Sequence, residues 1–265
     1  MGDSALDVII PAASGLLGAL LGSIVPFLLN RKASRLEYKL KMTELDKMES
    51  YRMGDAFARL QSDSLGVRMG ALFELKKAGL GSPEEQADIV RVLSSFIRER
   101  IENKELMEPS RTPGYELRPR EDVFEACKVV SLFYRETGCR AELDHLIARG
   151  FDLSRLQLEG ANLSYADFQH ALLNGSNFQK AFLIWAKLQH TNFIFSKLQG
   201  ANFKNATLKE TQLGSANLQG VKGLTAKHLL YVHVAHTDEV TIDSLDPDLR
   251  AEYDRLKAER GGGEI

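Results

Sequence analysis

The chain has 265 residues, of which 44% are apolar and 26% charged, an ordinary balance for a folded protein of one to three domains. Its formal net charge of −2 argues against a general nucleic-acid-binding protein, because such proteins usually carry a strong basic excess. Two cysteines, Cys127 and Cys139, are too few for a disulfide framework and have no metal-ligand spacing, so we expect them to be reduced and structural.

The first predicted element is a membrane span. From Val8 to Leu29 the sequence contains 22 residues without a charge, enough to cross the bilayer core as one helix. A cleaved signal peptide is the alternative, but Asp3 and Asp7 lie where a signal peptide would be basic, which favours an anchor. Basic residues follow the span, and this charge bias predicts a single-pass protein with most of the chain in the cytoplasm.

Small residues recur every four positions along this span and share one helix face. Such residues let two helix backbones approach closely, so they predict a homo-oligomer or association with a partner helix. The alternative is that Gly and Ala are simply common in membrane helices. The two rows of the predicted association face are Ser14, Gly18 and Gly22, and beside them Gly15, Ala19 and Ser23.

Residues 31–150 are predicted to be helical, beginning with a juxtamembrane helix. Residues 56–101 contain two apolar-periodic stretches and so predict a helical hairpin. Gly79 and Gly81 are expected to end its first helix, and Ser82, Pro83 and Glu85 to open the second as N-cap, first position and capping-box acid.

The rest of this region is predicted to contain a loop and two further helices. Residues 102–121 include three prolines and one glycine, which predicts a loop. Helices are expected near residues 121–136 and 139–149.

A period of five dominates the second half of the chain. From Leu153 to Leu218 every fifth residue is Leu or Phe, and from Ala161 onward the residue two places earlier is Ala, Ser or Thr. A helix repeats every 3.6 residues and a strand every two, so strict fives predict a backbone that turns a corner once per unit. Such short units bury their apolar side chains only by stacking, as in solenoids.

Several units, among them ANLSY, ADFQH, ANFKN and ANLQG, fit the motif A(D/N)LXX outright. This stretch resembles the pentapeptide repeat family, and the resemblance implies a right-handed quadrilateral β-helix with four units per coil. Residues twenty apart would then stack along the axis. Central residues would point inward from the four faces and small residues would fill the corners, here Leu163, Phe168, Leu173 and Phe178, and Ala161, Ala166 and Ala171 respectively.

Two flanking stretches add to this resemblance. A pattern between Leu60 and Arg98 resembles a helical module that precedes pentapeptide repeats in bacterial membrane proteins, and the stretch from Gly223 resembles their closing cap. The implied class is α+β, with the bulk of the chain on the cytoplasmic side of the bacterial inner membrane. The predicted domains are an anchor (1–30), a juxtamembrane helix and helical module (31–150), a β-helix (151–223) and a C-terminal helical cap with a flexible tail (224–265).

No catalytic motif stands out. The sequence has no GxxxxGK(S/T) phosphate loop, no GxSxG nucleophile elbow and no HExxH metal motif, so we expect no enzyme, no cofactor and no metal site. The coil register would stack His170, His190 and Glu210 along one outer edge. They are either solvent-facing polar residues or a ladder that binds a cation or responds to pH.

The charge of the repeats bears on nucleic acid and its mimics. Some pentapeptide repeat proteins imitate DNA with an acidic rod, but residues 151–220 carry six basic and four acidic side chains. A slightly positive rod is a poor imitation of a polyanion, so no nucleic-acid partner and no DNA mimicry are expected.

A group of apolar residues occupies outward positions where other units mostly have Asn, Gln, Lys or Gly. Exposed apolar clusters usually mark an interface, which predicts a protein partner, although the chain's own helices are an alternative cover. The candidate interaction surface consists of Tyr165, Phe182, Ile184, Trp185, Ile194 and Phe195.

Together these features predict a non-enzymatic, membrane-anchored interaction or assembly protein. It would oligomerise through its transmembrane helix and present a cytoplasmic β-helix to a protein partner. The alternative is a membrane-perturbing effector of a bacterial defence or toxin system, in which the assembled spans act on the bilayer.

Overall fold

The computed structural model describes residues 52–231 and 243–259. The chain divides into two compact units, Met1–Asp55 and Ala56–Ile265, and the second contains the elements discussed below. Within the described ranges no helix is both long and apolar enough to cross a bilayer. The predicted span from Val8 to Leu29, with its association face, lies outside these residues.

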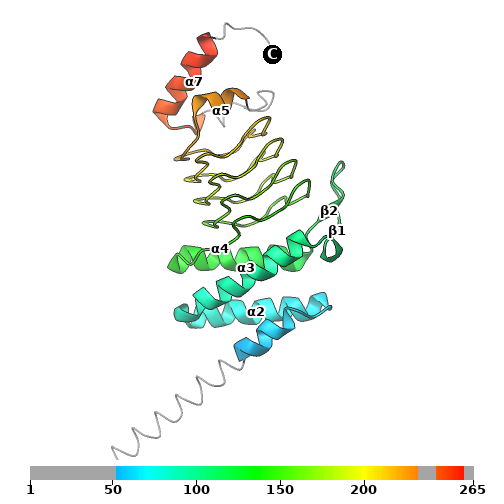
Figure 1. Cartoon of the computed structure of the whole chain (residues 1–265). Helices are drawn as coiled ribbons and strands as arrows, with labels where there is room; N and C mark the ends of the chain where they lie inside the picture. Colours follow the sequence, from blue (N-terminus) through cyan, green and yellow to red (C-terminus); the bar gives the residue numbers. More distant parts are fainter. Residues whose placement is uncertain (1–51, 232–242, 260–265) are drawn as a thin grey trace, which may run out of the picture. The chain divides into compact units, whose positions relative to one another are not determined.

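Three helices of 17 residues form the helical module: α2 (Leu65–Gly81), α3 (Gln86–Glu102) and α4 (Glu121–Thr137). Helix α4 packs against both α2 and α3 (Figure 1). The predicted helices near 56–101 and 121–136 are therefore confirmed in type and approximate position.

The turn between α2 and α3 differs from its prediction. Helix α2 runs through Gly79 and ends at Gly81, so only the second of the two predicted glycines marks its end. A Cβ at position 79 would lie 2.4 Å from the ring of Phe133 on α4. Pro83–Glu85 forms a short 3₁₀ helix, η1, and Ser82 makes no side-chain capping bond. The capping box was therefore wrong, and Gly79 serves close helix packing.

A buried ion pair joins α2 to α4. The Arg68 guanidinium donates from Nε to Asp122 Oδ2, and both side chains are fully buried. Arg68 also donates to the carbonyl oxygens of Ser62 (2.7 Å) and Asp63 (2.9 Å), while Asp122 accepts from the Val123 amide. The charges are thus largely hydrogen-bonded, as buried charges must be.

The β-helix has the predicted register of twenty residues. Parallel bridges run in series from Glu142↔Asn162 to Asn202↔Lys222. Each wall is hydrogen-bonded to the next coil, as in Leu163 N to Phe182 O (2.8 Å) and Phe182 N to Ala161 O (2.9 Å). The central residues Leu163, Phe168, Leu173 and Phe178 and the corner alanines are all fully buried, which confirms the predicted inside of the coil.

Each corner is a turn that ends in a left-handed residue. Ala166 N, for example, bonds to Leu163 O, and Tyr165 between them has φ of 61°, as position three of a type II turn requires. The Asn or Asp before the central residue accepts from the backbone N–H two residues on, as Asn162 Oδ1 does from Ser164 N (3.2 Å). This side-chain turn explains why the motif carries Asn or Asp at that position.

The coil begins earlier than predicted. Glu142 and Ile147 already bridge to the next coil, so residues 139–149 form no helix and that prediction was wrong. Leu143 holds a central position, but Ala148 takes the next one, and this small residue hides the period of five from a search for Leu or Phe. The predicted domain boundary at residue 151 lies inside the first coil.

The helical module caps the lower edge of this first coil. Ser94 Oγ on α3 accepts from Glu142 N, Glu102 Oε1 from Ile147 N, and Ser131 Oγ on α4 from Glu159 N, each at 3.1 Å. Exposed strand edges invite pairing with other chains, and these side chains satisfy the edge amides instead. The two parts are therefore joined by direct hydrogen bonds.

The segment 102–121, predicted as a loop, supplies the remaining wall of the cap. After the 3₁₀ helix η2 (Lys104–Leu106), β1 (Glu108–Pro109) pairs antiparallel with β2 (Leu117–Arg118). Leu117 O accepts from Asp152 N (3.0 Å), where a lower coil would otherwise bond. The hairpin thus substitutes for one missing strand.

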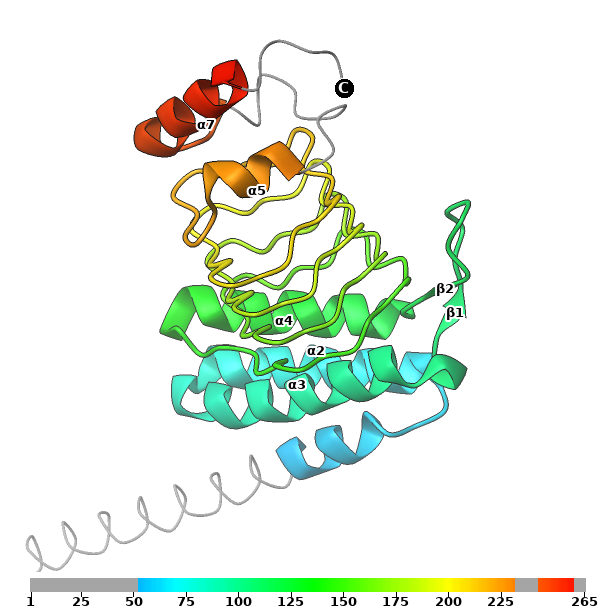
Figure 2. The same ribbon diagram turned by 45° about the horizontal axis from the view of Figure 1, so that its top comes forward.

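At the far end of the coils lie helix α5 (Ala226–Tyr231) and helix α7 (Pro247–Glu259), which contact each other (Figure 2). Ser244 Oγ accepts from Leu218 N (2.9 Å) and Asp246 Oδ1 from Gly220 N (3.3 Å). These bonds satisfy amides of the last coil, as expected of a closing cap.

Candidate interaction surface

Three aromatic rings stack along one corner of the β-helix, and we call His145, Tyr165 and Trp185 the aromatic edge. The rings of His145 and Tyr165 lie 4.9 Å apart between centroids and those of Tyr165 and Trp185 6.5 Å apart, with interplanar angles of 5° and 3°. Tyr165 is 50% and Trp185 52% exposed. The stacking of Trp185 over Tyr165 agrees with the predicted register of twenty residues, and the stack continues to His145.

His145 was absent from the sequence-based surface. To place His145 on the aromatic edge, the period of five must be extended back past Ala148 to the unit that contains Leu143. A search that accepts Ala at a central position would have found it.

The aromatic edge occupies strained backbone positions. The φ angles of His145, Tyr165 and Trp185 are 59°, 61° and 59°, in the left-handed region that disfavours side chains with a Cβ by about 1–2 kcal/mol. At other corners of the coil, Gly160, Gly175 and Gly200 hold the equivalent position of the turn without that strain. The bulky rings therefore bring no advantage to the turn itself.

Phe182 and Ile184 lie on the face that leads to this edge and are half-buried. The guanidinium carbon of Arg140 stacks over the Phe182 ring at 4.1 Å, and Arg140 Nε donates to Gly160 O (2.7 Å). The chain's own helical module thus leaves Tyr165 and Trp185 half exposed, while a linker residue covers Phe182.

Ile194 and Phe195 do not join the aromatic edge. Four units make one coil, so residues ten apart lie on opposite faces, and Phe195 occupies the corner diagonal to Trp185. Phe195 is 68% exposed and Ile194 half-buried. The six residues of the predicted surface therefore form two separate patches.

The predicted polar ladder is also present. The imidazoles of His170 and His190 stack at 4.6 Å between centroids, and His190 Nδ1 lies 3.1 Å from Glu210 Oε2. Among the described residues no group of three His, Cys, Asp or Glu side chains could hold a metal ion.

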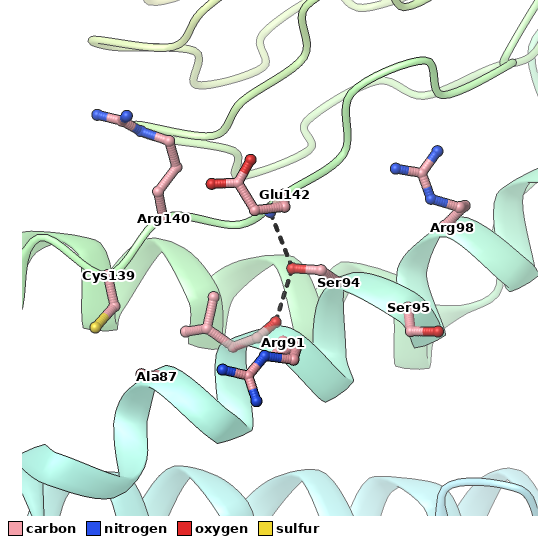
Figure 3. A pocket seen from close by; sticks show the side chains of 9 residues that line it. Ala87, Arg91, Ser94, Ser95, Arg98, Cys139, Arg140 and Glu142 are labelled. Atoms are coloured by element: carbon pink, nitrogen blue, oxygen red, sulfur yellow. Dashed lines mark hydrogen bonds between the residues drawn. The ribbon is translucent and has the colours of Figure 1, made fainter.

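A groove of about 390 Å³ lies between α3 and the start of the first coil (Figure 3). Its charged lining consists of three arginines and one glutamate. Ser94 connects the two walls, since its Oγ donates to Val90 O (2.7 Å) and accepts from Glu142 N. The charged residues are Arg91, Arg98, Arg140 and Glu142.

The two cysteines occupy different surroundings. Cys127 is fully buried in α4, and this burial raises the pKa of its thiol, which keeps it protonated and unreactive. Cys139 lines the groove, and both thiols are free.

Comparison with known proteins identifies the repeats. Residues 152–189 and 186–222 match the family model for pentapeptide repeats, with eight copies. This part of the chain is therefore a pentapeptide repeat β-helix, and proteins of this type are in general structural or interaction proteins rather than enzymes. No curated protein sequence matched the chain.

Solved structures of similar fold include HetL from Nostoc sp. strain PCC 7120, involved in regulating heterocyst differentiation, at 30% identity over 31% of this chain and 42% of HetL, with a TM-score of 0.28. Rfr23 from Cyanothece 51142 is 28% identical over 29% of this chain and 52% of its own length, with a TM-score of 0.29. The full-length fluoroquinolone resistance protein QnrB1 is 16% identical over 47% of this chain and 67% of its own, with a TM-score of 0.21. This chain thus spans about half the length of the first two relatives, and TM-scores this low support no inference about function.

Proposed function

We propose that this chain is a non-enzymatic, membrane-anchored interaction protein whose rigid β-helix presents the aromatic edge to a protein partner. The exposed stack of His145, Tyr165 and Trp185 carries this proposal. Aromatic side chains are enriched at interface hot spots, and rings already held in a stack lose little side-chain entropy on binding.

The anchor is the second part of the proposal. The uncharged run from Val8 to Leu29 supports it, together with the basic residues that follow. We propose that the small residues of this run, including Gly18 and Gly22, bring copies of the chain together in a bacterial inner membrane, with the β-helix in the cytoplasm. Several aromatic edges in one assembly would then bind a partner with higher avidity.

Site-specific photocrosslinking tests the aromatic edge. Replacing Tyr165 with p-benzoylphenylalanine in the full chain keeps an exposed aromatic ring at this corner, and we expect crosslinks to a protein partner or to a second copy. The same replacement at Phe195, an exposed ring on the diagonal corner, is the matched control and should give few crosslinks. Crosslinking of equal strength at both positions, or at neither, would contradict the proposed surface.

A separate experiment tests the anchor and its association. Wild-type chain should remain in the membrane fraction after a carbonate wash, because the apolar run buries more area than a peripheral contact. Gly18→Leu combined with Gly22→Leu should keep membrane insertion but dissociate the oligomers in mild detergent, since Leu prevents close approach of the backbones. A wild-type monomer in mild detergent would exclude self-association, and release by carbonate would exclude the anchor.

A further inference from the structure

The groove beside α3 and the aromatic edge lie on the same face of the β-helix. In the coil register, one wall of this face runs from Arg140 at one corner, past Glu142 and Asp144, to His145 at the next corner. Arg98 on α3 reaches Asp144 at 3.7 Å, so the α3 side of the groove meets the foot of the edge. A ligand on the aromatic edge therefore also faces the groove.

One arginine of the groove, Arg140, is held in position without a carboxylate partner. Arg140 is held in place by Gly160 O and by the ring of Phe182, and no acidic side chain among the described residues pairs with it. Arg98 has only long contacts, 3.7 Å to Glu102 and 3.7 Å to Asp144. A guanidinium fixed in position and lacking a carboxylate is ready to form strong, directed bonds to one.

The acidic lining residue Glu142 is bonded to the coil wall and not to Arg140. Glu142 Oε2 accepts from Asn162 Nδ2 at 2.6 Å, which holds the carboxylate against the coil wall. Of the three guanidiniums in the lining, Arg91 is paired with Asp88 (2.9 Å) and Arg98 lies 3.7 Å from both Glu102 and Asp144. Arg140 is therefore the lining arginine that has no carboxylate partner among the described residues. Ser94 and Ser95 also line this space of about 390 Å³, and Ala87 and Val90 add an apolar floor.

We infer that this groove binds an acidic segment of a protein partner, whose carboxylates bond to Arg140 and Arg98 while an apolar side chain packs on Trp185. The inference rests on the proposed function, because it specifies the partner that the aromatic edge receives. A folded acidic peptide segment fits better than nucleic acid, since the repeats as a whole are nearly neutral and lack the long basic track that a phosphate backbone requires.

Fluorescence anisotropy with designed peptides tests the inference on the full chain in mild detergent. The probe is a short fluorescein-labelled peptide rich in glutamate with one central tryptophan, and its control has glutamine in place of every glutamate. We expect only the glutamate peptide to bind, and Arg140→Gln and Arg98→Gln each to weaken it about tenfold, the loss of one charge-assisted bond. Arg155→Gln removes an equal charge at the diagonal corner and should leave binding unchanged.

The remaining outcomes separate this inference from the proposed function. Because Arg140 also packs on Phe182, Arg98→Gln and a melting curve for each variant distinguish loss of binding from loss of fold. No binding of the glutamate peptide, an equal loss with Arg155→Gln, or tighter binding of a single-stranded DNA oligomer through the same arginines would overturn the inference. The proposed function would survive any of these results if crosslinks at position 165 persisted and were lost in Trp185→Ala.

Discussion

The helical module and the β-helix are stabilised by different kinds of contact. In the module, the ion pair between Arg68 and Asp122 and the fit of Gly79 against Phe133 each occur once. In the β-helix, a side-chain turn by Asn or Asp recurs at seven corners, and central Leu or Phe residues recur at nearly every wall. Contacts made once are individually costly to lose, whereas repeated polar contacts share the stability of the coils among many similar bonds.

A single substitution inside the coil should be as costly as the loss of a contact that the module makes once. The largest effect on stability is expected there. Leu198→Asp places a charge among fully buried side chains, which costs about 4 kcal/mol or more because nothing there solvates it. Lys197→Asp, one residue earlier and pointing outward between Asn177 and Asn217, should cost less than about 1 kcal/mol. Urea denaturation measures both, and equal midpoints would reject the register of the β-helix.

A double-mutant cycle tests the buried ion pair between Arg68 and Asp122 in the helical module. Arg68→Met leaves Asp122 buried without its partner and should lower the free energy of unfolding by about 3–5 kcal/mol. Combining it with Asp122→Leu removes both charges, so the double variant should lose much less than the sum of the two single variants. Additive losses would mean that the two side chains do not act as a pair.

The same contrast explains how much the sequence predicts. The register, the buried centres and the stacking of Trp185 over Tyr165 follow from a period of five, because every unit repeats the same information. Ala148 breaks this pattern, and the first coil was therefore expected to be a helix. The pairing of Arg68 with Asp122 joins residues 54 positions apart and has no periodic signal.

The candidate site likewise has one part that the sequence predicts and one part that it does not. Stacking along one corner was visible as residues twenty apart, but the groove needs α3 to lie beside the first coil. Arg98 and Arg140 line one groove only because Ser94 and Glu102 cap the edge amides of Glu142 and Ile147. That arrangement depends on tertiary packing, which local sequence patterns do not contain.

A repeated polar contact should be individually weak. Asn192 Oδ1 accepts from Ile194 N at 2.9 Å, and Asn192→Ala should cost about 1 kcal/mol, the usual net value of one hydrogen bond. Gln212 holds the same position one coil later, where an Ala substitution should change stability by less than about 0.5 kcal/mol. A loss above about 3 kcal/mol for Asn192→Ala would show that the corners are not independent.

An effect of about the same size is expected where the two regions meet, at Asp152 in the first coil. Its carboxylate accepts from Ser110 Oγ (2.8 Å) and Thr112 Oγ1 (2.6 Å) of the β1–β2 hairpin and from Ser154 Oγ (2.5 Å). Burial acts to raise the pKa of this carboxyl, but the hydrogen bonds from Ser154, Thr112 and Ser110 outweigh it and lower the pKa below its ordinary value. Protonation therefore weakens the attachment of the hairpin.

The sign of the pH dependence follows from that lowered pKa. The unfolded chain binds the proton at a higher pH than the folded chain, so the stabilisation from Asp152 is complete above the ordinary aspartate pKa of about 3.9 and is lost as pH falls through the lower folded value. Asp152→Asn should cost about 1 kcal/mol at neutral pH and progressively less in acid. The Asp152 amide bonds to Leu117 O, so its hydrogen-exchange rate reports how firmly the β1–β2 hairpin is attached to the first coil. This rate should increase in Asp152→Asn at neutral pH. An unchanged exchange rate would show that the hairpin is held to the first coil without this carboxylate.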